Sequence, residues 1–150
     1  MKIKGFFDER YKPPAPFIKA IVESQKLKIR KIVYFHIDTG ASLTIILDKD
    51  VKYLGINVNT LRKAGRQIGG IGGFINTYQI EDAKLLFITE NQKIIEEKLV
   101  LHVGIHDPTK LSPEEKEMIM RIPSLLGRDI IHRFKLAYNK PKNEIYLEKT

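Results

Sequence analysis

The chain contains no cysteine and no tryptophan, and it has no long uninterrupted apolar run. Without cysteine it can form neither disulfides nor thiolate metal sites, so its core must be built from aliphatic side chains, phenylalanine and tyrosine. No segment approaches the ~20 apolar residues that span a bilayer, and residues 1–5 lack an apolar stretch of signal-peptide length. We therefore expect a soluble, cytoplasmic protein with no membrane partner, no cofactor and no metal.

The basic residues are numerous but scattered. The chain carries 26 Lys and Arg against 18 Asp and Glu, which gives a net charge of +8. A basic balance of this size suggests a nucleic-acid partner when the charges cluster. Here no run of five or more basic residues occurs, and no aromatic-basic signature of RNA-binding domains is present. Nucleic acid is therefore not the expected partner, and a solvated surface rich in lysine and glutamate is the simpler interpretation.

The length and composition fit one domain preceded by a short arm. With 150 residues and 43% hydrophobic content, the chain can bury an ordinary core. Three prolines near the start restrict the backbone to extended or turn conformations: Pro13, Pro14 and Pro16. We interpret residues 1–16 as an N-terminal arm and residues 17–150 as the folded domain.

Two segments that lead to Asp38 are predicted to be strands. Residues 17–24 are rich in apolar residues, residues 27–38 have the two-residue alternation of a strand, and a short turn separates the two segments. On the second strand the alternation directs Ile37 to the core and places His36 on the same face as Asp38. We therefore expect His36 to face a cleft beside Asp38.

Short strands and short helices make up the rest of the chain. Asp48 is a suitable helix cap and Gly55 a suitable helix end, while Ser112 and Glu115 form a capping box around Pro113. The predicted elements are, in order, a strand over 44–47, a helix over 48–54, strands over 77–89 and 94–104, a helix over 113–121, a strand over 125–127, a helix over 128–134 and a closing hairpin over 135–138 and 144–147.

Three motifs carry the functional signal. The first, Asp-Thr-Gly-Ala at residues 38–41, follows an apolar strand that delivers one carboxylate into a tight turn, and the glycine lets the backbone turn without a Cβ clash. The second is the glycine-rich segment 68–75, whose glycines lie between apolar arms as in a hairpin tip. The third, Leu-Leu-Gly at residues 125–127, consists of two apolar residues followed by glycine.

In this order the three motifs resemble those of the retropepsins, the retroviral-type aspartic proteases. The helix expected over 48–54 makes the chain more similar to single-domain cellular and prokaryotic members than to the viral enzymes. The resemblance implies an all-β, acid-protease closed β-barrel fold with a flap hairpin and two or three short helices. It also implies aspartic endopeptidase activity on polypeptides.

The family chemistry requires two carboxylates that share one proton, because like charges about 3 Å apart cannot both ionise. One chain supplies one Asp-Thr-Gly motif, so a second identical chain must supply the other carboxylate, and a homodimer is required. The resemblance implies that Asp38 is the catalytic acid, that Thr39 hydrogen-bonds to the opposite loop, and that Gly40 offers its carbonyl to the substrate. Five other aspartates lack this sequence context, and we interpret them as helix caps or surface charges, with Asp129 expected to pair locally after the strand at 125–127: Asp48, Asp50, Asp82, Asp107 and Asp129.

The substrate is expected to be an extended peptide held under the flap. Flap glycines free backbone groups to pair with a peptide as an added strand, and closure excludes water from the reaction. The residues expected to bind substrate are His36, Ala41, Ser42, Ile68, Gly69, Gly70, Ile71, Gly72 and Leu125, with Ile122 or Pro123 as further pocket residues.

Two departures from the viral pattern concern the dimer. Ser42 replaces an acidic residue that pairs in viral enzymes with the arginine matching Arg128, so Arg128 needs another partner or rests against the backbone. The longer C-terminal segment is expected to fold back as a hairpin. The alternative function is a catalytically weak retropepsin-like module for dimerisation or peptide binding, because a fold alone does not prove chemistry.

Overall fold

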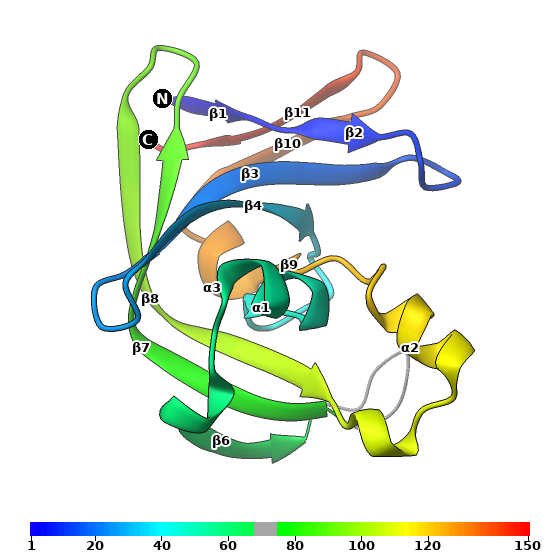
Figure 1. The fold of residues 1–150 in the computed structure, drawn as a ribbon. Coiled ribbons are helices and arrows are strands. Elements are labelled where there is room, and N and C mark those ends of the chain that lie inside the picture. The colour runs from blue at the N-terminus through cyan, green and yellow to red at the C-terminus, as the bar shows by residue number, and fades with distance from the viewer. Residues whose placement is uncertain (68–74) are drawn as a thin grey trace.

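The computed structural model describes residues 1–67 and 75–150, with the backbone alone for residues 65–67 (Figure 1). Strands dominate: β1 Lys2–Lys4, β2 Phe6–Asp8, β3 Ala15–Ser24, β4 Ile29–Ile37, β5 Ile45–Ile46, β6 Arg62–Gln67, β7 Ile75–Ile88, β8 Ile94–His106, β9 Leu125–Leu126, β10 Lys135–Asn139 and β11 Glu144–Glu148. The helices are α1 Asp48–Leu54, α2 Pro113–Ile119 and α3 Arg128–Ile131, with 3₁₀ turns at Val58–Thr60 and Pro108–Lys110. None of the helices in the described ranges has both the length and the hydrophobicity of a membrane span.

The larger sheet closes into a ring of hydrogen-bonded strands. Its strand order is β2-β3-β4-β9-β5-β8-β7-β6, and an additional pairing between β3 and β7 joins the two sides. In that pairing Ile21 lies opposite Leu86. Phe35 from β4 and Phe87 from β7 are fully buried inside the ring. The expected all-β fold is confirmed, and the three short helices match the two or three that the sequence predicts.

A second sheet of three strands brings the two ends of the chain together. Its order is β1-β11-β10, and Figure 1 shows the termini side by side. Reciprocal backbone bonds join Met1 to Lys149, with N to O distances of 3.1 and 3.0 Å. The predicted closing hairpin is β10 and β11. Within the N-terminal segment 1–16, β1 pairs with β11 and β2 pairs with β3.

Helix termini follow the capping rules in two cases and depart from them in one. At α2 the Ser112 hydroxyl accepts from the Glu115 N–H at 3.2 Å, and the Glu115 carboxylate accepts from the Ser112 N–H at 3.2 Å, so the capping box is confirmed. Gly55 ends α1 with a left-handed φ of 71°. The prediction that Asp48 caps α1 is wrong, because Asp48 is the first helical residue and its carboxylate binds His106 instead. The N-cap is Leu47, which makes no side-chain cap bond.

Candidate active site

Backbone hydrogen bonds fix the position of Asp38 at the end of β4. Alternate β4 residues, including Phe35 and Ile37, are buried in the core and anchor the strand. Directly after the strand, the Asp38 N–H donates to the Leu126 carbonyl at 3.0 Å, and the Ala41 N–H donates to the Asp38 carbonyl at 3.1 Å. The strand therefore delivers Asp38 into a tight turn, as the sequence predicts.

Gly40 allows the turn to approach the carboxylate. Its N–H donates to Asp38 Oδ1 at 2.9 Å. A Cβ at this position would lie 3.1 Å from the same oxygen, which is a tight contact. The absence of a side chain therefore lets the backbone N–H reach the Asp38 carboxylate.

Strand β9 crosses behind the Asp38 loop. It pairs in parallel with β4, with His36 opposite Leu125, and antiparallel with β5, with Ile45 opposite Leu125. The next residue after β9, Gly127, passes so close to the loop that a Cβ there would lie 2.5 Å from the carbonyl carbon of Leu43. This position requires glycine for that reason. The strand predicted over 125–127 is confirmed as β9.

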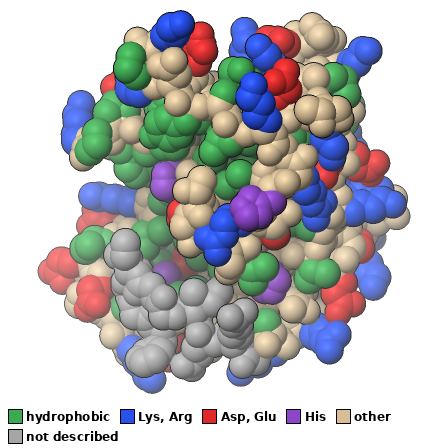
Figure 2. All heavy atoms as spheres, turned by 180° about the vertical axis from the view of Figure 1, so that it is seen from behind, with side chains coloured by type: hydrophobic (Ala, Val, Ile, Leu, Met, Phe, Trp, Pro, Cys, Tyr) green, Lys and Arg blue, Asp and Glu red, His purple; other side chains and the backbone are tan. Residues whose placement is uncertain are grey.

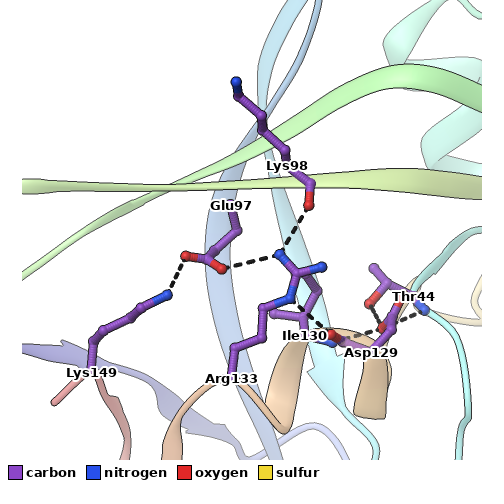
Figure 3. Close-up of polar contacts among 7 residues, drawn as sticks. All are labelled: Thr44, Glu97, Lys98, Asp129, Ile130, Arg133 and Lys149. Carbon is purple, nitrogen blue, oxygen red and sulfur yellow. Dashed lines mark hydrogen bonds and ion pairs between the residues drawn. The ribbon is translucent and has the colours of Figure 1, made fainter.

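A buried threonine ties α3 to the Asp38 loop. Asp129 Oδ1 accepts from the Thr44 N–H at 3.0 Å, from the Thr44 hydroxyl at 2.6 Å and from the Ile130 N–H at 2.9 Å (Figure 3). The same hydroxyl accepts from the Gly127 N–H at 3.0 Å. Thr44 is fully buried. Asp129 therefore pairs locally with Ile130, as expected from the sequence, and is also a structural acceptor for the distant Thr44 beneath the loop.

Ion pairs extend this network to the C-terminus. The Arg133 guanidinium donates to the Asp129 carbonyl at 3.1 Å and to the Glu97 carboxylate at 3.1 Å. Glu97, on β8, is buried and also pairs with the Lys149 ammonium at 2.7 Å (Figure 3). A buried carboxylate needs such partners, because isolation from water would otherwise destabilise its charge.

A cavity of about 510 Å³ opens beside Asp38. Its wall contains the predicted residues His36, Ala41, Ser42 and Leu125, together with both Ile122 and Pro123. Gly40 also lines it, whereas Thr39 is exposed and is not part of the wall formed by the described residues. The sequence did not indicate six further lining residues: Tyr11, Leu43, Ile45, Leu47, Ile75 and His106. On the face drawn in Figure 2, hydrophobic side chains gather above the residues shown in grey.

Comparison with known proteins identifies the family. A family profile described as "Retroviral aspartyl protease" matches residues 13–138, which is most of the chain. The chain belongs to the retroviral aspartyl protease family. No match was found among curated protein sequences. Among solved structures, this retropepsin-like chain is similar in fold to a retropepsin-like aspartic protease from Rickettsia conorii, with 22% identity, coverage of 98% of this chain and 97% of that chain, and a TM-score of 0.57. The EIAV protease complexed with the inhibitor HBY-793 matches with 19% identity over 79% of this chain and 86% of that chain, at a TM-score of 0.45.

Arg128 of this retropepsin-like protein rests against the backbone. Its Nη1 donates to the Thr39 carbonyl at 2.7 Å. Its own N–H donates to the Ala41 carbonyl at 2.9 Å. With Ser42 in place of an acidic residue, the guanidinium thus binds the carbonyl next to Asp38, which was one of the two arrangements expected from the sequence.

His36 lies on the cavity wall next to Asp38. The backbone N–H of His36 donates to the Ser124 carbonyl at 2.9 Å, and the His36 ring packs against the Phe17 ring with a centroid separation of 5.5 Å. Burial lowers the pKa of His36 below its ordinary value of 6.5, and the negative charge of Asp38 opposes that shift only in part. The imidazole is therefore neutral at neutral pH.

His106 is a second histidine on the wall, and no local motif marks it in the sequence. It is the last residue of β8, and its Nδ1 lies 2.7 Å from Asp48 Oδ1. Its backbone N–H donates to Asp48 Oδ2 at 3.0 Å. The two residues are 58 positions apart, so only the folded chain brings them together.

The remaining aspartates have structural roles outside the cavity wall. Asp107 caps a 3₁₀ turn through the Thr109 N–H, as a cap interpretation predicts. Asp50 is buried rather than on the surface, because the Ser124 hydroxyl donates to it at 2.6 Å. Asp82 accepts from the Ser24 hydroxyl at 2.7 Å and from the Lys26 N–H at 3.0 Å. Within the described residues, no three histidine or acidic side chains converge as metal ligands would.

The flap residues predicted to bind substrate lie outside the described residues: Ile68, Gly69, Gly70, Ile71 and Gly72. On either side of them, β6 and β7 pair antiparallel, with Arg62 opposite Gln79 and Lys63 opposite Tyr78. These two strands are the arms between which the sequence places the flap.

Proposed function

We propose that the protein is a homodimeric aspartic endopeptidase that hydrolyses peptide bonds in extended polypeptides, with one Asp38 carboxylate from each subunit. The observation that carries this proposal is the placement of Asp38. It is the only acidic residue among the described residues that line the 510 Å³ cavity, and the glycine turn at residues 38–41 holds it. Membership of the retroviral aspartyl protease family supports the same chemistry.

The reaction needs the two carboxylates in different protonation states. The ionised Asp38 takes a proton from a water molecule, whose oxygen attacks the carbonyl carbon of the scissile bond. The protonated Asp38 of the other subunit donates a hydrogen bond to the carbonyl oxygen as negative charge develops there. The first Asp38 then passes the proton taken from water to the leaving nitrogen, the carbon–nitrogen bond breaks, and the amine and carboxylic acid products leave the pair in its starting state. Because the two acids share one proton, they titrate as a pair.

The second carboxylate has to come from another copy of the chain. Within the described residues no second aspartate lines the cavity, so the site of one subunit is incomplete. An isologous dimer places the same loop on both sides of a two-fold axis. Thr39 is exposed at the turn, so this part of the loop is accessible to the second subunit. The Arg128 guanidinium fixes the loop backbone by donating to the Thr39 carbonyl. We expect the isolated subunit to be inactive.

The cavity favours a substrate with apolar side chains. Ile45, Leu47 and Ile75 form buried parts of its wall, and Leu125 is half-buried beside them. Apolar side chains that leave water for such a wall stabilise the complex by about 25 cal/mol for each Å² buried. We expect cleavage next to apolar residues of an unfolded or extended polypeptide.

Replacement of Asp38 by asparagine tests this function. Asp38→Asn keeps the shape and the bond from Gly40 but cannot ionise, so cleavage of a peptide library should fall to background while the thermal midpoint stays close to that of the wild type. Asp107→Asn is the matched control, because Asp107 lies at an exposed turn outside the cavity. Turnover by Asp38→Asn would refute the assignment. A stable dimer that binds peptides but cleaves none of them in wild-type form would establish the alternative, a non-catalytic peptide-binding module.

A further inference from the structure

Among the described residues of the cavity wall, His106 has the most enclosed polar side chain. The residue is 7% exposed, and its side chain is 4% exposed. Around it the wall is mainly apolar, with Leu47 and Ile75 both buried. A buried imidazole in such surroundings needs hydrogen-bond partners, because an unpaired polar atom there is costly.

Asp48 satisfies one edge of the His106 ring. A separation of 2.7 Å between Nδ1 and Asp48 Oδ1 requires a proton on Nδ1, since the carboxylate can only accept. In the neutral ring this bond selects the tautomer in which Nε2 is an acceptor. Asp48 does not line the cavity, so the bonded edge of the ring is directed toward α1. Nε2 is the remaining polar atom of the ring, and the hydrogen bonds of His106 to the described residues involve only its Nδ1 and its backbone.

The backbone around His106 holds the ring in place. As the last residue of β8, His106 lies opposite Ile75, the first residue of β7. Asp48 Oδ2 accepts from the backbone N–H of His106 at 3.0 Å, so one carboxylate binds both the ring and the main chain of His106. Asp48 is itself fixed as the first residue of α1, whose Val51 and Leu54 are buried in the core. The imidazole is therefore a pre-positioned group, and little conformational freedom is lost when a ligand binds it.

We propose that His106, oriented by Asp48, determines the specificity of one substrate pocket by accepting a hydrogen bond at Nε2. The inference rests on the proposed protease function. The preferred substrate residue there carries a neutral N–H or O–H donor on its side chain, with the carboxamides glutamine and asparagine as the best match. An aliphatic side chain would leave Nε2 buried without a partner. A lysine ammonium would lose its hydration in an otherwise apolar pocket, and a carboxylate would face the charges of Asp48 and Asp38.

The experiment is a cleavage-specificity profile. Wild-type protein is incubated with a proteome-derived peptide library, and the residues around each cut are identified by mass spectrometry. The same profile is recorded for His106→Leu, for His106→Gln, which keeps a polar hydrogen-bonding side chain, and for His132→Leu as the control. His132 is an exposed histidine outside the cavity. Thermal unfolding of each variant is measured beside the profile.

The wild-type profile should show one position at which carboxamide or hydroxyl side chains are preferred over aliphatic ones, by about tenfold for one hydrogen bond. In His106→Leu this preference should disappear or reverse at that position alone, whereas His106→Gln should keep part of it and His132→Leu all of it. A wild-type profile with only apolar preferences overturns the inference, and this result needs no variant to fold. A preference that survives in folded His106→Leu also overturns it. If the wild type cleaves no peptide beyond those that Asp38→Asn also cleaves, the proposed function itself is refuted.

Discussion

Substitution of Thr44 measures how much its buried hydroxyl beneath the Asp38 loop contributes to the free energy of unfolding. Its hydroxyl donates to Asp129 Oδ1 at 2.6 Å and accepts from the Gly127 N–H at 3.0 Å. Thr44→Val replaces this hydroxyl by a methyl group of similar size on the same β-branched frame, so the backbone preference and the packing volume change little. The Thr44 N–H can still donate to Asp129. The substitution therefore removes two hydrogen bonds and almost nothing else.

The expected loss of stability follows from the burial of the groups. A hydrogen bond to a charged acceptor contributes about 1.5–3 kcal/mol, and an unsatisfied buried N–H costs about 1–3 kcal/mol. Thr44 is fully buried, so water cannot replace the lost partner. Partial relaxation around the new methyl group reduces the sum, and we expect a loss of about 3 kcal/mol in the free energy of unfolding. Peptide cleavage should fall as well, because Gly127 directly follows the strand whose Leu126 carbonyl holds the Asp38 N–H.

Urea unfolding of Thr44→Val and of Thr109→Val measures this contribution. Thr109 is a matched control because its hydroxyl donates to Asp107 Oδ1 at 2.7 Å, but Thr109 is exposed to water and Asp107 is only half-buried. We therefore expect a much smaller loss for Thr109→Val, since water can take the place of the hydroxyl. All proteins are compared at one concentration, because dimer formation would make the midpoint depend on it. A loss below about 1 kcal/mol for Thr44→Val, or equal losses for both variants, would refute the reasoning.

Two further predictions concern the dimer and the cavity histidine. Addition of excess Asp38→Asn protein should suppress the activity of a fixed amount of wild type, because mixed dimers hold one ionisable Asp38 instead of two. Excess Asp107→Asn protein should have no such effect. Equal activity in the two mixtures would contradict a site shared between subunits. Burial lowers the pKa of His36, so the unfolded chain binds its proton more readily, and stability should decrease as the pH falls below about 6.5, the ordinary histidine value. His36→Leu lacks this contribution, so its urea midpoint should fall less than that of the wild type between about pH 7 and pH 5, and parallel pH dependences in the two proteins would show that the histidine makes no such contribution.

Local signals in the sequence were sufficient for the elements that carry the Asp38 loop. The alternation in β4 placed His36 and Asp38 on one face, and both line the cavity. The Ser112 capping box and the Gly55 helix end were also predicted, because each depends on residues within one helical turn. The Asp48 cap was predicted wrongly for the opposite reason: its carboxylate has a partner far along the chain, and that bond replaces the local one.

The sequence by itself determined the fold class, the position of the acid-bearing turn and the family, because all of these depend on short motifs and on the period of apolar residues. Only the tertiary structure decided which side chains complete the cavity. Tyr11 reaches the wall from the segment between β2 and β3, and His106 meets Asp48 across 58 residues. The Thr44 to Asp129 bond joins residues 85 positions apart. Contacts of this kind depend on how the ring of strands closes and on which residues lie next to β9 behind the loop. No local pattern in the chain specifies these long-range neighbours.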